Sequence, residues 1–159
     1  MSKADLQAAL QPIIAHLSLA NVNNHADLQQ EMNQLFPMNS SAIIRIKSLV
    51  DEGLSSGWLC PREANGIRFG RVCKSSDESS GFVVDAVDMD KPGPGHTHPE
   101  GEIDLCFALE GTPLFDGNPP GWTVYPPGSW HIPTVENGRM SILYFLPKGA
   151  IRFEPNPNP

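Results

Sequence analysis

Hydrophobic residues in the first third of the chain recur at intervals of three and four, the spacing of amphipathic helices. In the first segment they share one face: Leu6, Leu10, Ile13, Ile14 and Leu17. Ser2 and Asp5 resemble a capping box at its start. Pro12 interrupts the pattern, which predicts either a kink or a division into two short helices.

Two further helical segments are expected before residue 57. One covers about 25–36 and ends before Pro37. The next starts with Ser40 or Ser41 as its N-cap and ends at Gly53 or Gly57. We interpret the apolar faces of these helices as core that packs on the rest of the chain. A partner-binding helical surface is the alternative.

From Trp58 onward, short apolar runs alternate with Gly, Pro, Asn and Asp, which predicts an all-β unit of many short strands. The expected strands are 66–73, 81–89, 102–110, 121–126, 130–135, 139–146 and 150–153. The fold class is therefore mainly β. Residues 1–57 form a helical segment that packs on a barrel made by residues 58–159, within one structural unit.

The run from Ile103 to Leu109 is apolar at both odd and even positions except at Asp104. Such a run predicts a strand that is covered on both faces. One face would line the barrel interior, and the other would meet the N-terminal helices or a second subunit. A homodimer is expected on this ground, although covering by residues 1–56 explains the run equally well.

Length and charge narrow the classes of function. The 159 residues suffice for one domain with a substantial core. With 18 acidic against 11 basic side chains, the chain is a poor candidate for binding nucleic acid or an anionic membrane. No apolar run approaches the ~20 residues that span a bilayer. An odd number of cysteines and no basic-then-apolar leader predict a cytoplasmic protein.

The candidate chemistry gathers in the stretch 93–104. His96 and His98 stand two residues apart, so on a strand they point to the same face. Glu102 and Asp104 follow with the same spacing. A third histidine, His131, ends the later segment Pro-Pro-Gly-Ser-Trp-His. Neutral imidazoles with a carboxylate suit a divalent transition metal such as iron, manganese or zinc.

These motifs carry a resemblance to a known superfamily. His96-Thr97-His98 followed by Glu102, and then Pro126-x-Gly128-x-x-His131, resemble the two motifs of the cupins. The resemblance implies a small cupin-type antiparallel β-barrel with a metal near its centre, held by His96, His98, Glu102 and His131. Counting back from Gly111 places Asp104 at the glutamate position instead, so both carboxylates remain candidates.

A narrower resemblance extends over most of the chain. The strings His-Thr-His-Pro-Glu-Gly-Glu-Ile-Asp-Leu and Thr-Val-Tyr-Pro-Pro-Gly-Ser-Trp-His-Ile-Pro-Thr-Val are similar to the 4-hydroxylaminobenzoate lyase family. This implies conversion of a small aromatic carboxylate, 4-hydroxylaminobenzoate, to protocatechuate with release of ammonia, in bacterial nitroaromatic degradation. Two alternatives stay open: another metal-dependent cupin enzyme, such as an aromatic dioxygenase or isomerase, and a ligand-binding cupin without catalysis.

Further residues are candidates for catalysis or substrate binding. Whichever of Glu102 and Asp104 is not a ligand is a natural general acid or base. Tyr125 could pass protons, Trp130 and Tyr144 could stack on an aromatic substrate, and Arg71 could clamp a carboxylate. Core packing, or a solvated edge position for the arginine, is the alternative for each.

Two more side chains are given structural interpretations. Cys106 shares parity with the two carboxylates and is expected to be a buried, inert thiol. Asp116 is expected to be a turn or rim residue.

Overall fold

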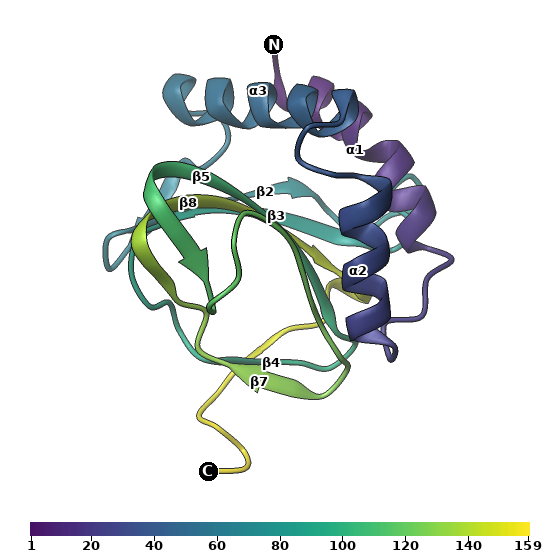
Figure 1. The fold of residues 1–159 in the computed structure, drawn as a ribbon, viewed down its shortest axis with the longest axis vertical. Helices are drawn as coiled ribbons and strands as arrows, with labels where there is room; N and C mark the ends of the chain where they lie inside the picture. The colour runs from purple at the N-terminus through teal and green to yellow at the C-terminus, as the bar shows by residue number, and fades with distance from the viewer.

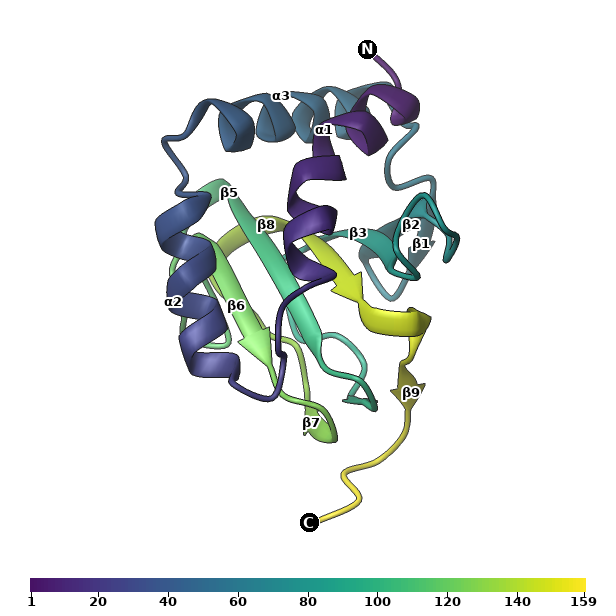
Figure 2. The ribbon, with the colours of Figure 1, turned by 90° about the vertical axis from the view of Figure 1, so that its right-hand side faces the viewer.

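Three helices form a layer on the outside of a β-barrel in the computed structural model, which describes residues 1–159 (Figure 1). Helices α1 (Lys3–Leu17) and α3 (Ser41–Ser56) lie against each other across the outer face of the main sheet, and α2 (His25–Leu35) runs beside strand β6 (Figure 2). None of the three is both long enough and apolar enough to cross a membrane.

The helix ends follow the sequence signals. The Ser2 hydroxyl accepts the backbone N–H of Asp5 at 3.3 Å, and Ser40 caps α3 in the same way. Gly57, with φ of 84°, ends α3 in a left-handed conformation that suits glycine. Pro12 lies inside one continuous α1, so the predicted division into two short helices does not occur.

Nine strands follow the helices. They are β1 (Arg62–Ala64), β2 (Ile67–Cys73), β3 (Val83–Met89), β4 (His96–His98), β5 (Glu102–Phe115), β6 (Gly121–Tyr125), β7 (Ser129–His131), β8 (Val135–Leu146) and β9 (Arg152–Phe153), with a 3-10 turn, η1 (Pro147–Gly149), between β8 and β9. A large antiparallel sheet has the order β1-β2-β3-β8-β5-β6, and a small one the order β7-β4-β9. The two sheets enclose the interior of a small barrel (Figure 1). The predicted mainly β fold is confirmed.

Strand β5 separates the two cores of the molecule. Ile103, Leu105 and Phe107 are fully buried in the core that the sheet shares with the helices. The alternate residues, including Glu102 and Asp104, face the barrel interior. Helices of the same chain cover the outer face, so its burial requires no second subunit, and the homodimer stays a prediction.

One predicted strand is wrong. The segment 130–135 is broken after His131, because Pro133 has no N–H for a ladder and the N–H of Thr134 is bound by a side chain. Strand β8 begins directly after this break. In addition, β5 runs to Phe115, five residues beyond its predicted end, and β1 falls in no predicted run.

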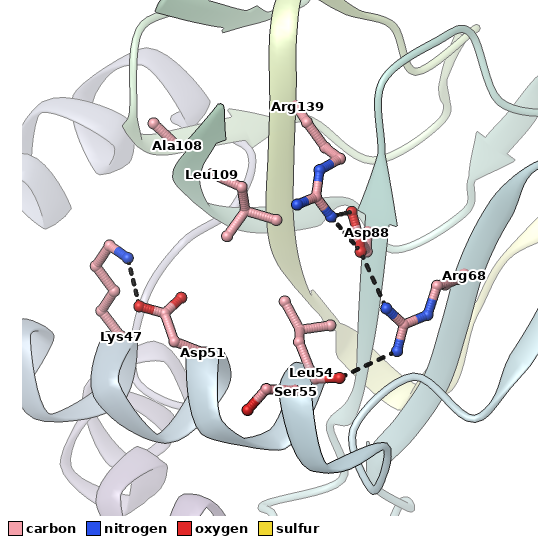
Figure 3. Close-up of a pocket in the computed structure, with 9 residues that line it drawn as sticks. All are labelled: Lys47, Asp51, Leu54, Ser55, Arg68, Asp88, Ala108, Leu109 and Arg139. Carbon is pink, nitrogen blue, oxygen red and sulfur yellow. Dashed lines mark hydrogen bonds and ion pairs between the residues drawn. The ribbon is translucent and has the colours of Figure 1, made fainter. Parts of the chain in front are cut away.

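Buried Asp88 ties α3 to the barrel. Its carboxylate, 4 % exposed, accepts from Arg139 of β8 at 2.8 and 3.0 Å and lies 3.5 Å from Arg68 of β2. Arg68 also donates to the carbonyl of Leu54 in the last turns of α3 at 3.2 Å. These residues line a polar pocket of about 390 Å³ between α3 and the sheet (Figure 3). The arginines are already satisfied by these contacts, so we interpret the pocket as a structural junction.

Candidate metal centre

Strand pairing brings the three histidines together. His96 and His98 stand two apart on β4, so both rings leave the strand on one side. His131 on β7 lies directly opposite His96, because the antiparallel register pairs the two residues. Glu102, the first residue of β5, reaches the same place from the large sheet. The small sheet thus supplies three imidazoles and the large sheet one carboxylate.

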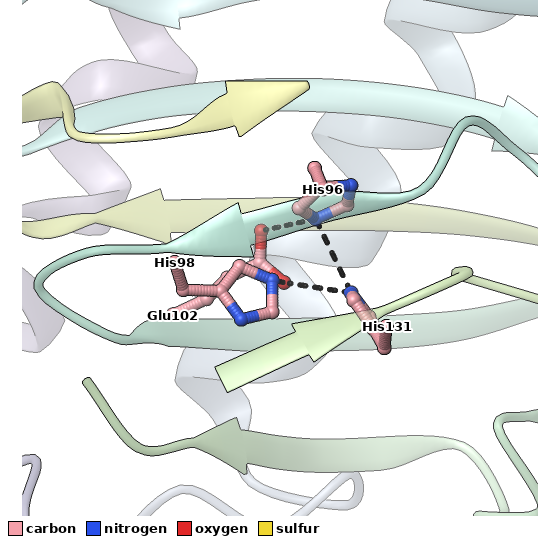
Figure 4. A group of neighbouring side chains, drawn as sticks. All are labelled: His96, His98, Glu102 and His131. Carbon is pink, nitrogen blue, oxygen red and sulfur yellow. Dashed lines mark hydrogen bonds and ion pairs between the residues drawn. The ribbon is translucent and has the colours of Figure 1, made fainter. Parts of the chain in front are cut away.

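The four side chains converge within the barrel interior (Figure 4). Their potential ligand atoms all lie within 4.8 Å of one another. From Glu102, the carboxylate oxygens are 3.1 Å from His98 Nε2 and 3.7 Å from the Nε2 atoms of His96 and His131. Two atoms that share one metal at about 2.1 Å are separated by about 3.0–3.4 Å. The observed spacings are close to that range, and they bring Glu102, not Asp104, to the three imidazoles.

The chemistry of the donors also fits a metal ion. Nε2 of His98 and one carboxylate oxygen of Glu102 are buried without a hydrogen-bond partner. Burial of such atoms is unfavourable unless something satisfies them. A divalent cation between them would satisfy both. Three neutral nitrogens and one anionic oxygen form a donor set that iron, manganese and zinc all accept.

Two of the imidazoles are fixed from behind through Nδ1. The carbonyl oxygen of Pro94 lies 3.0 Å from Nδ1 of His96 and can only accept, so this nitrogen carries the proton. The Ser129 hydroxyl donates to the carbonyl of Pro126 at 2.7 Å and therefore accepts from Nδ1 of His98 at 2.9 Å. In both rings the lone pair is left on Nε2, which points to the centre.

A glycine before the first histidine lets the two motif segments approach each other. A Cβ at Gly95 would lie 2.5 Å from Cζ2 of Trp130 on the neighbouring strand. The Trp130 indole donates to the backbone carbonyl of Glu154 at 2.8 Å, and Trp130 does not line the large cavity described below. Trp130 therefore packs beside the site, which is the alternative that the sequence left open, and a role in stacking on substrate stays a prediction.

The carboxylates Glu102 and Asp104 differ in their surroundings. Burial alone would raise the pKa of Glu102, but contacts with His96 and His98 outweigh it and keep the pKa low. Asp104 has neither oxygen paired, and burial, reinforced by the charge of Glu102, raises its pKa well above the ordinary value. The pKa of Glu102 is therefore held below that of Asp104, so the negative charge of the pair favours Glu102.

Polar residues form one row across the interior of the large sheet. Register pairs Arg71 with Asp85, Asp85 with Tyr144, Tyr144 with Asp104, and Asp104 with Thr123, so all five lie on one face. The hydroxyl oxygen of Thr123 is buried without a partner, as is Asp104. The row therefore runs from an ion pair at one end to two unsatisfied groups beside Glu102.

A cavity of about 990 Å³ leads from the surface to the site. Its lining includes His96, Glu102 and Tyr144 at the site, apolar walls such as Phe69, and basic residues such as Arg71. Arg71 pairs with Asp85 at 2.9 Å and its side chain is 60 % exposed. The predicted carboxylate clamp thus lies on the cavity but already has an acidic partner.

Two sequence interpretations change in the structure. Asp116 is in a turn, as expected, but its carboxylate points inward and accepts from Nδ1 of His131 at 2.7 Å. The Tyr125 hydroxyl donates to the same oxygen, and burial together with this contact raises the pKa of Tyr125 far above its usual range. Tyr125 is thus held as a neutral donor to Asp116.

Cys106 is fully buried, which raises the pKa of its thiol, as expected of an inert residue.

Asp116 went undetected because its partner is distant in sequence. The one available signal was the dipeptide Asp116-Gly117, which is typical of a two-residue hairpin turn. That signal predicts the turn but not the direction of the carboxylate.

Comparison with known proteins identifies relatives over most of the chain. The family model "PnbB: 4-hydroxylaminobenzoate lyase" matches residues 10–153. A 4-hydroxylaminobenzoate lyase of Pseudomonas putida is 30 % identical over 148 residues, covering 82 % of this chain and 84 % of the relative. A protein of the same name from Nocardioides sp. (strain LMS-CY) is 32 % identical, covering 87 % and 88 %. Among solved structures, an RmlC-like cupin protein from Ralstonia eutropha JMP134 matches with a TM-score of 0.43 and 12 % identity, over 58 % of this chain and 62 % of that one.

Proposed function

The chain belongs to the 4-hydroxylaminobenzoate lyase family, and from this premise we propose that it converts 4-hydroxylaminobenzoate to protocatechuate and ammonia at a metal centre. The proposed ligands are His96, His98, Glu102 and His131. One observation carries the proposal: three imidazoles and a carboxylate meet within 4.8 Å, and two of these residues, His96 and Glu102, line a large cavity.

The proposed reaction is balanced without an external oxidant or reductant. One water is consumed, the N–O bond breaks, the nitrogen leaves as ammonia, and the ring ends with two hydroxyl groups. The electron pair that nitrogen gains comes from the ring. The protein must therefore help the hydroxyl oxygen leave the nitrogen and must direct water to the ring, which are acid–base and positioning tasks.

The ligand set suits these tasks. When bound, a divalent metal acts as a Lewis acid toward oxygen and lowers the pKa of bound water. His96, His98 and His131 contribute no charge, and Glu102 contributes one negative charge. The outer contacts of Pro94 and Ser129 keep the imidazole lone pairs directed inward before any metal arrives.

Asp104 is the proposed proton-exchanging residue. It lies beside Glu102 on the same face of β5, close enough for the two carboxyl groups to interact, and no other side chain satisfies its oxygens. Asp104 is fully buried and is not among the residues that line the cavity, so it would reach the substrate or a water only past Glu102, which does line it. Thr123, opposite on β6, offers a second unpaired oxygen at the same level.

The substrate carboxylate is proposed to lie toward the mouth of the cavity. Lys3, Arg62 and Arg71 line this cavity, against Asp85 as the acidic residue outside the ligand set. The chain as a whole has a net charge of −7, so this local excess of positive charge favours an anionic ligand. Apolar walls between the basic mouth and the site suit an aromatic ring, with Tyr144 at the inner end.

The proposed position of the substrate carboxylate can be tested separately. Arg62→Gln should lower kcat/KM for 4-hydroxylaminobenzoate about fivefold, because a partly exposed ion pair contributes about 1 kcal/mol. The same change should leave kcat/KM for phenylhydroxylamine, which lacks the carboxylate, unaffected. Arg45→Gln on α3 is the matched control. Equal losses on both substrates would contradict this orientation of the substrate.

The central experiment combines metal analysis with turnover. Purified protein is assayed for bound metals and for release of ammonia and protocatechuate from 4-hydroxylaminobenzoate. His131→Ala and His96→Ala should lose both the metal and the activity. His25→Ala, a change of the same kind on α2, should lose neither.

Two outcomes would overturn the proposal. Full turnover in a metal-free His131→Ala protein would remove the metal from the reaction. Oxygen consumption matched to product formation would instead favour a dioxygenase. The proposed reaction runs at the same rate under anaerobic conditions.

A further inference from the structure

Asp116 stands in a strained, well-defined turn directly behind one of the proposed ligands. Phe115 and Asn118 exchange two backbone hydrogen bonds of 2.8 Å, and between them Asp116 and Gly117 have φ of 48° and 83°. A two-residue hairpin loop of this kind accepts Asp, Asn or Gly at its first position and disfavours other residues. The turn thus fixes where the Asp116 carboxylate begins and restricts what can replace it.

Three hydrogen-bond donors converge on this one carboxylate. Nδ1 of His131 lies 2.7 Å from Oδ2, and the Tyr125 hydroxyl donates to the same oxygen. The backbone N–H of Thr134 donates to Oδ1 at 2.8 Å. Tyr125 and Thr134 hold the carboxylate still, because a phenol and an amide N–H at these positions both act as donors. The remaining lone pair of Oδ2 points at Nδ1 of His131.

His131 depends on such a hydrogen-bond partner more than the other two histidines do. Its side chain is 12 % exposed, compared with 5 % for His96 and none for His98. Its Nε2 lies 3.2 Å from Nε2 of His96 and 3.7 Å from Glu102, so the ring must present a lone pair there. If the proton moved to Nε2, it would point at the ligand atoms and the ring could not bind a metal.

We propose that Asp116 is a positioning residue that holds the proton of His131 on Nδ1 and so reserves Nε2 for the metal centre, with Tyr125 and Thr134 orienting its carboxylate. The inference rests on the proposed metal site. It assigns a role to Tyr125 that differs from proton transfer to substrate: the phenol contacts Asp116 and acts through it.

Asp116→Asn is the decisive substitution, because asparagine keeps both the shape and the tolerance for a positive φ. A carboxylate accepts all three donors, whereas an amide has only one accepting atom. If the Asn oxygen stays with Thr134, the NH₂ group faces His131 and forces its proton to Nε2. The opposite arrangement would set the NH₂ group against the N–H of Thr134, a backbone donor that cannot accept, so it is disfavoured. The substitution therefore weakens the site without creating a cavity.

Two measurements follow on the full chain. The first is the tautomer of His131, read from ¹⁵N shifts and long-range ¹H–¹⁵N couplings with the protein zinc-loaded and after chelation. The wild-type ring should carry its proton on Nδ1 in both states, and the Asp116→Asn ring should shift to Nε2 after chelation. His96 and His98 should keep their tautomers. The second is zinc affinity by competition with a chelating dye, which should fall about 10- to 100-fold in Asp116→Asn.

Tyr125→Phe is the matched variant, since it removes one bond to the same carboxylate but leaves the charge. It should keep the His131 tautomer and a zinc affinity within about threefold of wild type, well short of the 10- to 100-fold loss expected when an outer-shell partner is removed. A loss as large as that of Asp116→Asn would overturn the inference. So would a wild-type His131 protonated on Nε2 after chelation, a result that requires no variant to fold. Wild-type protein that binds no divalent metal would overturn the proposed function instead, while the tautomer still tests Asp116.

Discussion

Replacing Gly95 with alanine tests how closely the two histidine segments must pack. The new Cβ would lie 2.5 Å from Cζ2 of Trp130 and 3.2–3.3 Å from two further ring atoms. Carbon atoms in contact are normally separated by about 3.5–4.0 Å, so the ring or the β4 backbone must move by about 1 Å. Gly95 does not have a positive φ, so alanine is compatible with its backbone and the contact alone carries the effect.

The expected size of the effect depends on the residues next to Trp130 and Gly95 in the chain. Each is next in sequence to a proposed ligand, His131 and His96, and the indole is anchored on the carbonyl of Glu154. Forcing extra atoms into a packed region costs about 1–3 kcal/mol of stability. A displacement of about 1 Å at a reacting group lowers rates about a hundredfold. We therefore expect Gly95→Ala to lose both stability and most of its turnover.

The assay is a double-mutant cycle. Urea denaturation gives the free energy of unfolding, and zinc content and ammonia release report the site. Trp130→Phe removes the ring atoms that collide and should by itself be mild, apart from one hydrogen bond worth about 1 kcal/mol. The pair Gly95→Ala/Trp130→Phe should recover metal content relative to Gly95→Ala alone. Additive losses, or a Gly95→Ala protein with wild-type stability and full metal, would refute this account of the packing.

Three other predictions concern groups elsewhere in the fold. Asp88→Ala should lower the free energy of unfolding, measured in urea, by about 1–3 kcal/mol. This is less than the roughly 3–5 kcal/mol of a fully buried pair, because the arginines that contact Asp88 can reach solvent. Asp85→Ala breaks a more exposed pair on the same strand and should cost less than about 1 kcal/mol. Ser129→Ala should weaken zinc binding about tenfold by freeing Nδ1 of His98, measured by dye competition with Ser55→Ala on α3 as control; unchanged affinity would mean that the hydroxyl does not hold the ring. Burial, reinforced by the charge of Asp88, raises the pKa of Cys60 to about 12, so the native protein should resist iodoacetamide at pH 8 and react in denaturant. Because the folded pKa lies above the unfolded one, the thiol's contribution to stability should be complete below a pH of about 8.5 and lost as the pH rises toward 12. Rapid alkylation of Cys60 in the native protein would contradict its burial.

The parts of the site that follow from local periodicity could be predicted from the sequence. His96 and His98 share a face because a strand alternates its side chains, and the Pro-Pro-Gly turn ahead of His131 places the third imidazole on a returning strand. The same periodicity could not decide between Glu102 and Asp104, because both have the same parity. That choice depends on where β5 starts relative to the small sheet.

Contacts between segments that are distant in sequence escaped prediction. Whether Arg71 is free to bind a substrate depends on which strand becomes its neighbour, and β3 happens to place Asp85 beside it. Asp116 depends on the direction of a turn, and the end of strand β7 depends on Pro133, which one-dimensional periodicity underweights. The helices were predicted more completely because caps and apolar faces are local signals.

The position of β8 has a consequence for the order in which this protein matures. The strand lies between β3 and β5 in the large sheet, yet it follows all four proposed ligands in the chain. On the ribosome, the histidines and Glu102 emerge before the strand that joins the two halves of the sheet exists. A nascent chain that ends before Val135 has the donor atoms of the proposed site but no complete sheet to align them, so that site is complete only after β8 is synthesised.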